Sequence, residues 1–265
     1  MIKIEKTHVS GWETAIRGMR NPMNSWDKSD SHTIGTPNGP EYCIGSEDLK
    51  LMMNLRNAGP EHAKYLRMIN VTCDITAPLY WWKEFDTYKV GTVVNSCSTM
   101  HKIMEKPFSM GDFSHEHLVA FPEACNLMSE LDMNIPDDAS LNFDADVYKN
   151  RGNLWSPRYM LVQTIAALNQ YRNLYIKVKN TPTKDLVKRN GNLKTIWWQI
   201  IQLLPSSYNQ KRTIQMNYAV LSNIYHQRTG HKLDEWRVGF INWIRALPYS
   251  QLIIGEEDTK DAVVD

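Results

Sequence analysis

Residues 71–103 read VTCDITAPLYWWKEFDTYKVGTVVNSCSTMHKI and combine three kinds of local pattern. From Val71 to Ile75 apolar and polar residues alternate, which predicts a half-buried strand. Pro78 follows at a position that the first turn of a helix accepts. Beyond that helix, the small and hydroxyl-bearing residues from Gly91 to Ser98 pack poorly, but they allow a ligand to come close to the backbone. The stretch therefore predicts a strand and a helix that lead into a candidate binding site.

The helix within this stretch has two interpretations. Leu79, Trp82 and Phe85 recur at helical spacing, whereas Lys83 and Glu84 fall on other faces. Periodicity alone favours a packed amphipathic helix with a solvated charged face. The small polar run that follows is what favours a functional role for the charged residues.

Helical spacing and capping residues predict further elements on both sides of this stretch. Ser46 stands as a capping residue before one helix, and Ser156-Pro157 opens another. Residues 21–40 are polar and rich in turn formers, so they are either a functional flap or partly disordered. Residues 177–191 are predicted to be a basic loop. The predicted helices cover residues 12–19, 46–55, 156–175, 193–204, 217–228 and 233–247, and extended segments cover residues 2–4 and 210–216.

Length and composition bound the domain organisation. With 265 residues, 42% of them hydrophobic, the chain can form one large domain or two small ones. Because core-forming helices lie on both sides of the basic loop, we predict a single domain over residues 1–265. Residues 111–155 are expected to be a peripheral insertion, and the acidic tail at about 255–265 is expected to be disordered.

Charge and cysteine usage argue against several partners. The chain has 30 basic and 29 acidic residues, which gives no electrostatic footprint for a nucleic-acid polymer or an acidic membrane. Its four cysteines lack CxxC or CxH spacing, so neither a metal site nor a disulfide framework is expected. No stretch approaches the run of about eighteen apolar residues that a membrane span needs. We therefore predict a cytoplasmic protein that binds neither nucleic-acid polymer nor membrane.

Two separated segments of the chain resemble the flavin-dependent thymidylate synthases. In that family a strand leads through "AP" to a helix bearing "RQ", and then to the motif "RHRxxSxNExSxR". Here Ala77-Pro78 leads to Lys83-Glu84. The later motif positions, with one extra residue before the asparagine, fall on Thr87, Tyr88, Lys89, Thr92, Asn95, Ser96, Ser98 and Met100. The second segment keeps the family's intervals at Leu204-Pro205, Asn217, Asn223, Arg228, His231 and Glu235-Trp236, the last pair in reversed order.

The resemblance implies a fold and an activity. The expected fold is α+β, with a mixed β-sheet packed with several long α-helices. The expected activity is that of a methyltransferase and reductase on a dUMP-like pyrimidine deoxynucleotide in dTMP biosynthesis, with FAD as cofactor and NADPH and methylenetetrahydrofolate as further reactants. The family's sites form between subunits, which implies a homotetramer. The alternative is a family-shaped protein that has lost the chemistry and keeps a nucleotide-binding or interaction role, because function lies in the site rather than in the fold.

The resemblance also implies roles for individual residues. Ser98 is the implied catalytic residue near the pyrimidine, with a loop serine bonded to its own backbone as the structural alternative. Arg228 is an implied pyrimidine contact, with a charge favoured by the helix dipole as its alternative. For the asparagines at the implied flavin positions, the structural alternative to a flavin contact is a helix cap or a surface amide. The full sets are Lys83, Glu84, Ser98 and Arg228 for the substrate, and Tyr88, Lys89, Asn95, Asn217 and Asn223 for the flavin.

The sequence departs from the family pattern at several of these positions. Thr87, Tyr88 and Lys89 replace the first arginine, histidine and arginine, and Ser96 replaces a glutamate. Met100 replaces the arginine that would grip the phosphate of the nucleotide, and a thioether cannot donate a hydrogen bond to phosphate. These departures predict weak flavin binding and a nucleotide or nucleoside that is held differently. A catalytic role for Cys97 or His231 is less expected than a structural one.

Overall fold

The computed structural model describes residues 1–37, 39–100, 102–120 and 156–255. The chain divides into two compact units, one formed by Met1–Cys97 with Gln210–Asp265 and the other by Ser98–Asn209. Most of the predicted insertion and nearly all of the predicted acidic tail lie outside the described residues. That the whole chain forms one domain stays a prediction.

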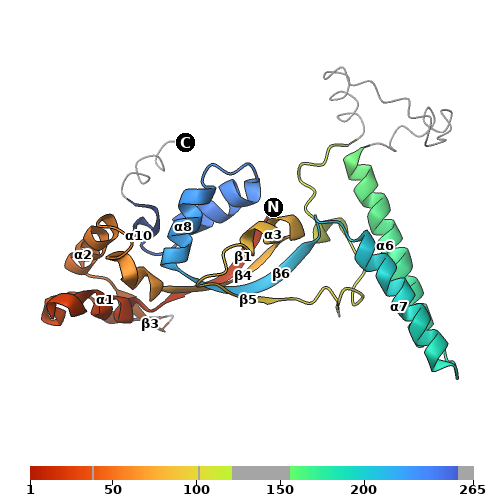
Figure 1. Cartoon of the computed structure of the whole chain (residues 1–265), viewed down its shortest axis with the longest axis horizontal. Helices are drawn as coiled ribbons and strands as arrows, with labels where there is room; N and C mark the ends of the chain where they lie inside the picture. Colours follow the sequence, from red (N-terminus) through yellow and green to blue (C-terminus); the bar gives the residue numbers. More distant parts are fainter. Residues whose placement is uncertain (38, 101, 121–155, 256–265) are drawn as a thin grey trace, which may run out of the picture. The chain divides into compact units, whose positions relative to one another are not determined.

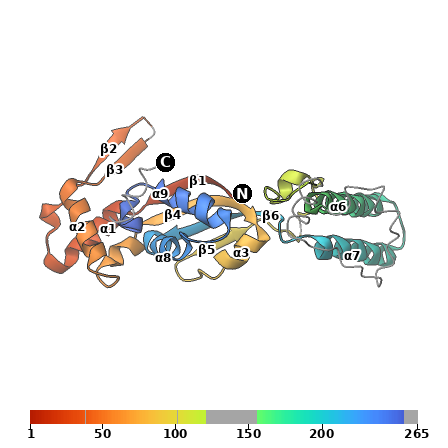
Figure 2. The same ribbon diagram turned by 90° about the horizontal axis from the view of Figure 1, so that it is seen from above.

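The first unit is built on a four-stranded sheet in the order β1-β4-β6-β5. Its strands pair antiparallel where the register is defined, for β1 with β4 and for β5 with β6. The helices α3 and α8 lie on the same side of this sheet (Figure 1). The strands are β1 (Lys3–Ser10), β4 (Asn70–Pro78), β5 (Val93–Ser96) and β6 (Asn209–Asn217). A separate antiparallel hairpin is formed by β2 (His32–Thr36) and β3 (Gly39–Cys43) (Figure 2).

Alternation along β4 and β6 decides which face of the sheet is covered. The residues of β4 that point to the helices, Val71 to Ala77 at every second position, are at most 2% exposed. On the other face Asp74 accepts a hydrogen bond from Thr213 at 2.6 Å and pairs with Lys211 at 3.0 Å. The predicted strand at 71–75 and the predicted extended segment at 210–216 are therefore confirmed. Pro78 is the last residue of β4 rather than a residue of the following helix, because it already has extended backbone angles.

The helices of the first unit match the predicted pattern with shifted ends. The predicted helices at 12–19, 46–55 and 217–228 are confirmed, whereas the segment predicted as one helix at 233–247 begins as a π-helix. The short 3₁₀ turns are η1 (Asn21–Met23), η2 (Trp26–Lys28) and η3 (Ala63–Arg67). The longer elements are α1 (Trp12–Arg20), α2 (Ser46–Asn57), α3 (Leu79–Phe85), α8 (Tyr218–Arg228), the π-helix η6 (Glu235–Phe240), α9 (Ile241–Arg245) and α10 (Gln251–Ile254).

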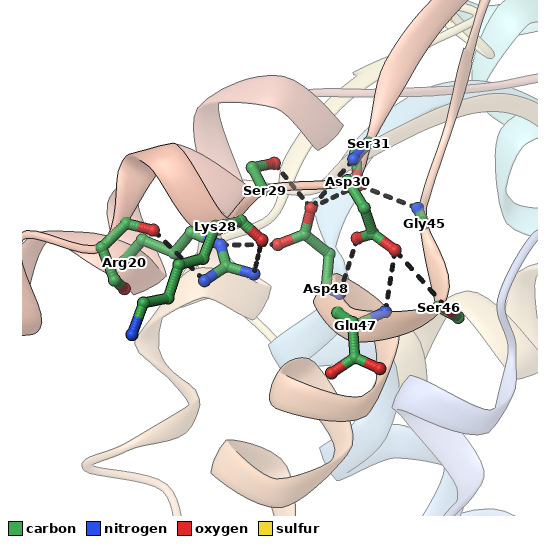
Figure 3. A network of polar contacts seen from close by, with 10 residues as sticks. Arg20, Lys28, Ser29, Asp30, Ser31, Gly45, Ser46, Glu47 and Asp48 are labelled. Carbon is green, nitrogen blue, oxygen red and sulfur yellow. Dashed lines mark hydrogen bonds and ion pairs between the residues drawn. The ribbon is translucent and has the colours of Figure 1, made fainter.

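A buried ion pair ties the last residue of α1 to the start of α2 (Figure 3). Arg20 Nε donates to Asp48 Oδ1 at 2.7 Å, and these side chains are 6% and 0% exposed. The second carboxylate oxygen of Asp48 accepts from the hydroxyls of Ser29 and Ser31, each at 2.6 Å. The sequence left residues 21–40 open as a flap or a disordered segment, and these contacts hold the part of that segment up to Ser31.

The capping of α2 differs from the prediction. Ser46 is the first residue of the helix and its side chain does not cap it. Instead, the carboxylate of Asp30 accepts from the backbone N–H groups of Glu47 and Asp48, each at 3.0 Å (Figure 3). These hydrogen bonds, led by the one from Glu47, lower the pKa of Asp30. A cap from a distant segment leaves no signal in the local sequence of a helix.

We expect Gly11→Ala to destabilise the protein. Gly11 has φ +94, and a Cβ built on it would lie 2.1 Å from the carbonyl oxygen of Met68. A side chain in this backbone region alone costs on the order of 1–3 kcal/mol, and the contact with a backbone atom adds to that cost. Urea unfolding measures the loss. Gly35→Ala is the matched control because its Cβ would meet nothing within 4 Å, and an equal loss in both variants would contradict the argument.

The second unit contains a hairpin of two helices, α6 (Pro157–Asn180) and α7 (Leu186–Leu203), which run side by side (Figures 1 and 2). As predicted, Ser156 caps α6, by accepting from the backbone N–H of Tyr159 at 3.2 Å. The predicted basic loop at 177–191 is wrong, because α6 and α7 continue into it and leave only residues 181–185 between them. The short turn η4 (Met110–Asp112) lies in the described part of the predicted insertion.

The second unit has its own small core. Phe108, Phe113, Leu168 and Ile200 are each at most 7% exposed and pack with neighbouring apolar residues. The side chain of Asn169 on α6 holds the segment before η4, because it accepts from Phe108 N at 2.8 Å and donates to Phe108 O at 2.9 Å. In the part of the chain that the structure describes, no helix is long and apolar enough to span a bilayer.

Candidate active site

An aromatic cluster in the first unit sets the position of α3. Trp81 and Trp82 are fully buried, and Phe85 is 1% exposed. The ring of Trp81 lies 4.6 Å from that of Trp236 and 5.7 Å from that of Phe240, both in the π-helix η6. Burying these large rings anchors α3 against η6 and leaves Lys83 and Glu84 on the other faces of α3.

Glu84 is the centre of a polar cluster on the outside of these rings. Its Oε2 accepts from Arg228 Nη1 at 2.7 Å and from Trp236 Nε1 at 2.9 Å, and lies 3.2 Å from His231 Nε2. Arg228 is the last residue of α8, and its guanidinium also lies 4.9 Å above the ring of Trp236. The carboxylate and guanidinium side chains are 34% and 18% exposed. The cluster is thus built from α3, α8, η6 and the loop between α8 and η6, and its two charged side chains are partly exposed to solvent.

Tyr88 and Gln227 extend the cluster along α8. The hydroxyl of Tyr88 accepts from Arg228 Nε at 2.8 Å and donates to Gln227 Oε1 at 3.0 Å. Gln227 in turn donates to Asn223 Oδ1 at 2.9 Å. One continuous chain of hydrogen bonds therefore runs from Glu84 to Asn223. We call Glu84, Tyr88, Gln227, Arg228, His231 and Trp236 the Glu84 cluster.

The hydrogen bonds of His231 fix the tautomer of its neutral ring. Nδ1 accepts from the backbone N–H of Leu233 at 3.1 Å, so the hydrogen of the neutral imidazole is on Nε2. Nε2 is the atom that faces Glu84. Glu84 Oε2 consequently receives three donors, while its Oε1 and Arg228 Nη2 contact no polar partner among the described residues.

A cavity of about 450 Å³ adjoins the far end of this chain of hydrogen bonds. Asn223 lines it together with His226 from α8 and Arg67 from η3. Arg56 also lines it, but its Nε and Nη2 donate to backbone carbonyls of residues 252 and 253 at 2.9 Å. Arg67 has no polar partner among the described residues and is exposed. The cavity therefore offers a free cation, an imidazole and an amide to an anionic ligand.

Solved structures match this chain over nearly its whole length, although no family model and no curated protein matches it. Thymidylate synthase X from Helicobacter pylori, solved with FAD and dUMP, has a TM-score of 0.56 at 14% identity, with 97% of this chain and 98% of that chain covered. A second flavin-dependent thymidylate synthase structure from Helicobacter pylori, complexed with FAD and dUMP, has a TM-score of 0.54 at 14% identity, with 96% and 98% covered. The UMP/dUMP methylase PolB from Streptomyces cacaoi, bound with 5-Br dUMP, has a TM-score of 0.53 at 13% identity, with 94% and 93% covered.

The chain has the fold of the flavin-dependent thymidylate synthases. The α+β fold that the resemblance implied is thereby confirmed. At 13–14% identity the match is evidence of fold alone, and the activity and cofactors of these proteins are not thereby those of this chain.

The thymidylate synthase fold brings together part of the predicted substrate set. Glu84 and Arg228 form the salt bridge at the centre of the Glu84 cluster. Lys83 is exposed on α3 and makes no side-chain contact with the described polar residues. Ser98 belongs to the second unit, where its carbonyl oxygen accepts from the backbone N–H of Lys102 at 3.3 Å. Met100 is also in the second unit and is 50% exposed.

The predicted flavin residues fall in three places. Tyr88 and Asn223 belong to the chain of hydrogen bonds described above, and Lys89 is exposed directly after Tyr88. Asn95 is exposed on β5, in register with Thr213. Asn217 caps α8, because its Oδ1 accepts from Val220 N at 3.0 Å.

The predicted small polar run passes directly beside the start of α8. A Cβ on Gly91, which has φ +76, would lie 3.1 Å from Asn217 Nδ2 and 3.0 Å from the side chain of Val220. The hydroxyl of the neighbouring Thr92 is buried and has no hydrogen-bond partner among the described residues. Close backbone approach and an unpaired buried hydroxyl are features that a bound ligand accounts for.

Three members of the Glu84 cluster were not predicted as site residues. Gln227 has a signal in the sequence, because it lies four positions after Asn223 on the same helix and can reach it. Trp236 and His231 fall within the family-like segment, but each is typical of a structural residue when considered alone. Their role becomes visible only when the aromatic cluster places η6 against α3.

Proposed function

We propose that this protein is a divergent flavin-dependent methylase of a pyrimidine nucleotide of the dUMP type. The observation that carries the proposal is the convergence of Glu84 and Arg228, predicted as substrate residues from segments 144 positions apart, on one salt bridge. The shared fold with thymidylate synthase X and with PolB supports the same class of substrate. The homotetramer implied by the resemblance is part of this proposal.

The Glu84 cluster suits the edge of a pyrimidine ring. Glu84 Oε1 can only accept and Arg228 Nη2 can only donate, and neither has a polar partner among the described residues. A uracil ring offers an N–H donor beside carbonyl acceptors, which is the complementary pattern. Hydrogen bonds with Trp236 and Tyr88 hold the side chains of Glu84 and Arg228 in place. The pair can therefore bind the pyrimidine ring without rearrangement.

The residues present also fit a flavin dinucleotide. Lys89, Arg67 and His226 supply donors suited to a pyrophosphate, and Asn223 links the cavity that Arg67 and His226 line to Tyr88. The unpaired Thr92 hydroxyl and the close approach of Gly91 to Asn217 mark a second place for the same ligand. A bound reduced flavin would supply hydride and a folate would supply the carbon unit. This chain's own residues bind and orient the ring, with Ser98 proposed as the catalytic group.

A nucleotide-binding protein without methylase activity is the second candidate. The specific observation in its favour is that Arg228 is already neutralised by Glu84 and that Met100 cannot grip a phosphate. The experiment that separates the two candidates is a methylation assay with dUMP, methylenetetrahydrofolate, FAD and NADPH. Formation of dTMP supports the methylase, whereas dUMP binding without product supports the binding protein.

Lys89→Ala is expected to weaken FAD binding at least about tenfold, because a charged hydrogen bond to phosphate contributes roughly 1.5–3 kcal/mol. Equilibrium titration followed by flavin fluorescence measures the dissociation constant. Cys97→Ala is the matched control, since Cys97 is exposed at the end of the same small polar run. Equal effects of both substitutions, or no binding by the parent protein, would refute the flavin site.

A further inference from the structure

The end of the α6–α7 hairpin concentrates positive charge. Residues 177–194 contain six basic residues and one acidic residue, a net charge of +5, in a chain whose whole net charge is +1. The five lysines of this segment are exposed, and Arg189 is half-buried. The set consists of Lys177, Lys179, Lys184, Lys188, Arg189 and Lys194. We call residues 177–194 the hairpin tip.

These cations are not compensated within the chain. None of the six forms an ion pair with a described residue, although Lys106, Lys211 and Arg212 elsewhere do. The single acidic side chain, Asp185, accepts from the backbone N–H of Lys188 at 2.9 Å and so caps α7. Nearly all of the positive electrostatic potential of the hairpin tip is therefore available to a partner.

Two large apolar side chains stand among these cations. Leu186 is 53% exposed and Val187 is 85% exposed, and both begin α7 directly after the turn. Lys184 precedes this pair and Lys188 follows it. Segments that lie in the interface of a bilayer typically combine exposed apolar residues with flanking lysines.

A small cavity is lined by residues that precede and follow the apolar pair in the sequence. It has a volume of about 320 Å³, and its walls include Lys188, Arg189, Thr183 and Asn192, with Asp185 also present. Arg189 Nε is buried and has no hydrogen-bond partner among the described residues. This volume is at the lower end of the range for small-molecule sites, and its donors suit a phosphate group.

We propose that the hairpin tip docks on an anionic phospholipid surface, with Leu186 and Val187 in the interfacial layer and a headgroup phosphate at Lys188 and Arg189. A second copy of the chain is a poor occupant because two tips of charge +5 repel each other. A nucleic-acid backbone matches the cations but gains nothing from two exposed aliphatic side chains. A bilayer satisfies both features, since it attracts the lysines and removes the apolar pair from water.

Sedimentation of the full chain with phosphatidylcholine vesicles, with and without phosphatidylserine, tests the proposal. We expect binding only when phosphatidylserine is present, and less binding as salt rises. Each lysine near such a surface contributes about fivefold to partitioning, so Lys184→Glu with Lys188→Glu should lower it at least about 25-fold. Leu186→Ser with Val187→Ser should lower vesicle binding and leave binding of a single-stranded oligonucleotide unchanged.

Lys28→Glu with Lys64→Glu is the matched control, because both lysines are exposed in the first unit and neither has an ion-pair partner among the described residues. The control should bind vesicles like the parent, and circular dichroism verifies that all variants are folded. Equal binding by the control and the charge-reversed tip overturns the proposal. So does an oligonucleotide affinity that exceeds vesicle affinity, or a tip-dependent dimer in light scattering.

Discussion

Asp48→Ala is expected to lower the free energy of unfolding by about 3–5 kcal/mol, the usual cost of removing one partner from a buried ion pair. The substitution leaves the guanidinium of Arg20 buried, and among the described residues its remaining partners are the carbonyl oxygens of Ser25 and Lys28, at 3.3 and 3.0 Å. It also leaves the hydroxyls of Ser29 and Ser31 without their shared acceptor. Chemical denaturation measures the change.

Glu105→Ala is the control for this prediction. Glu105 pairs with Lys102, but both side chains are more than 60% exposed, and surface pairs contribute about 0–1 kcal/mol. A loss at Asp48 no larger than that at Glu105 would show that the buried network is not a major source of stability.

The same network gives an expected pH dependence. Burial raises the pKa of Asp48, but hydrogen bonds from Ser29, Ser31 and Arg20 outweigh it, so the pKa is lowered overall. A carboxylate whose pKa is lowered on folding stabilises the protein above its unfolded value of about 4, and this contribution is lost as the pH falls further through the folded value. The parent should therefore lose stability below about pH 4 more steeply than Asp48→Ala does.

Much of the fold could be predicted because it depends on local pattern. The alternation at 71–75 and the apolar stripe at 217–228 follow from burial of one face, and both elements form where the sequence indicates. The lengths of α6 and α7 could not be predicted from the same rules. Three of the four residues from Lys177 to Asn180 are polar, and their helix is supported by continuation from a packed helix rather than by an apolar stripe of their own.

Only the site residues that stand at the spacing of a sequence motif could be predicted. Glu84 and Arg228 could be proposed from motif spacing, and the structure joins them. The three-donor arrangement at Glu84 depends on Trp236 and His231, whose positions follow from ring packing between distant segments. Asn217 was predicted as a flavin residue, but its side chain forms the helix cap that was the structural alternative. Its amide nitrogen nevertheless lies beside Gly91.

Whole-chain charge concealed the charge of the hairpin tip. A net charge of +1 led to the expectation of no polyanionic or membrane partner, although residues 177–194 alone carry +5. A sum over 265 residues averages out a segregated segment, and only the helical hairpin shows that these cations share one end of one structure. Charge has to be counted element by element before a partner class is excluded.

Arg228→Ala is expected to weaken dUMP binding by between about tenfold and a hundredfold, since a charged hydrogen bond contributes roughly 1.5–3 kcal/mol and about 1.4 kcal/mol is tenfold. Glu84→Gln is expected to weaken deoxyuridine binding as well, because the amide oxygen keeps the three donors and its NH2 group replaces the free acceptor Oε1. For dUMP the loss should be partly offset, since removing the carboxylate charge removes a repulsion toward the anionic nucleotide. Calorimetry with dUMP and deoxyuridine measures both affinities.

Two comparisons make this prediction specific to the Glu84 cluster. Arg237→Ala is the matched control, because Arg237 is an exposed arginine paired with Asp234 and should leave dUMP affinity unchanged. The loss from Glu84→Gln should be smaller for dUMP than for deoxyuridine, since only the nucleotide carries the phosphate charge. An Arg228→Ala protein that is folded and binds dUMP as tightly as its parent would show that the ring is held elsewhere. In that case the salt bridge of Arg228 with Glu84 is a structural tie between α8 and α3, and the cavity at Asn223 becomes the place to look for the nucleotide.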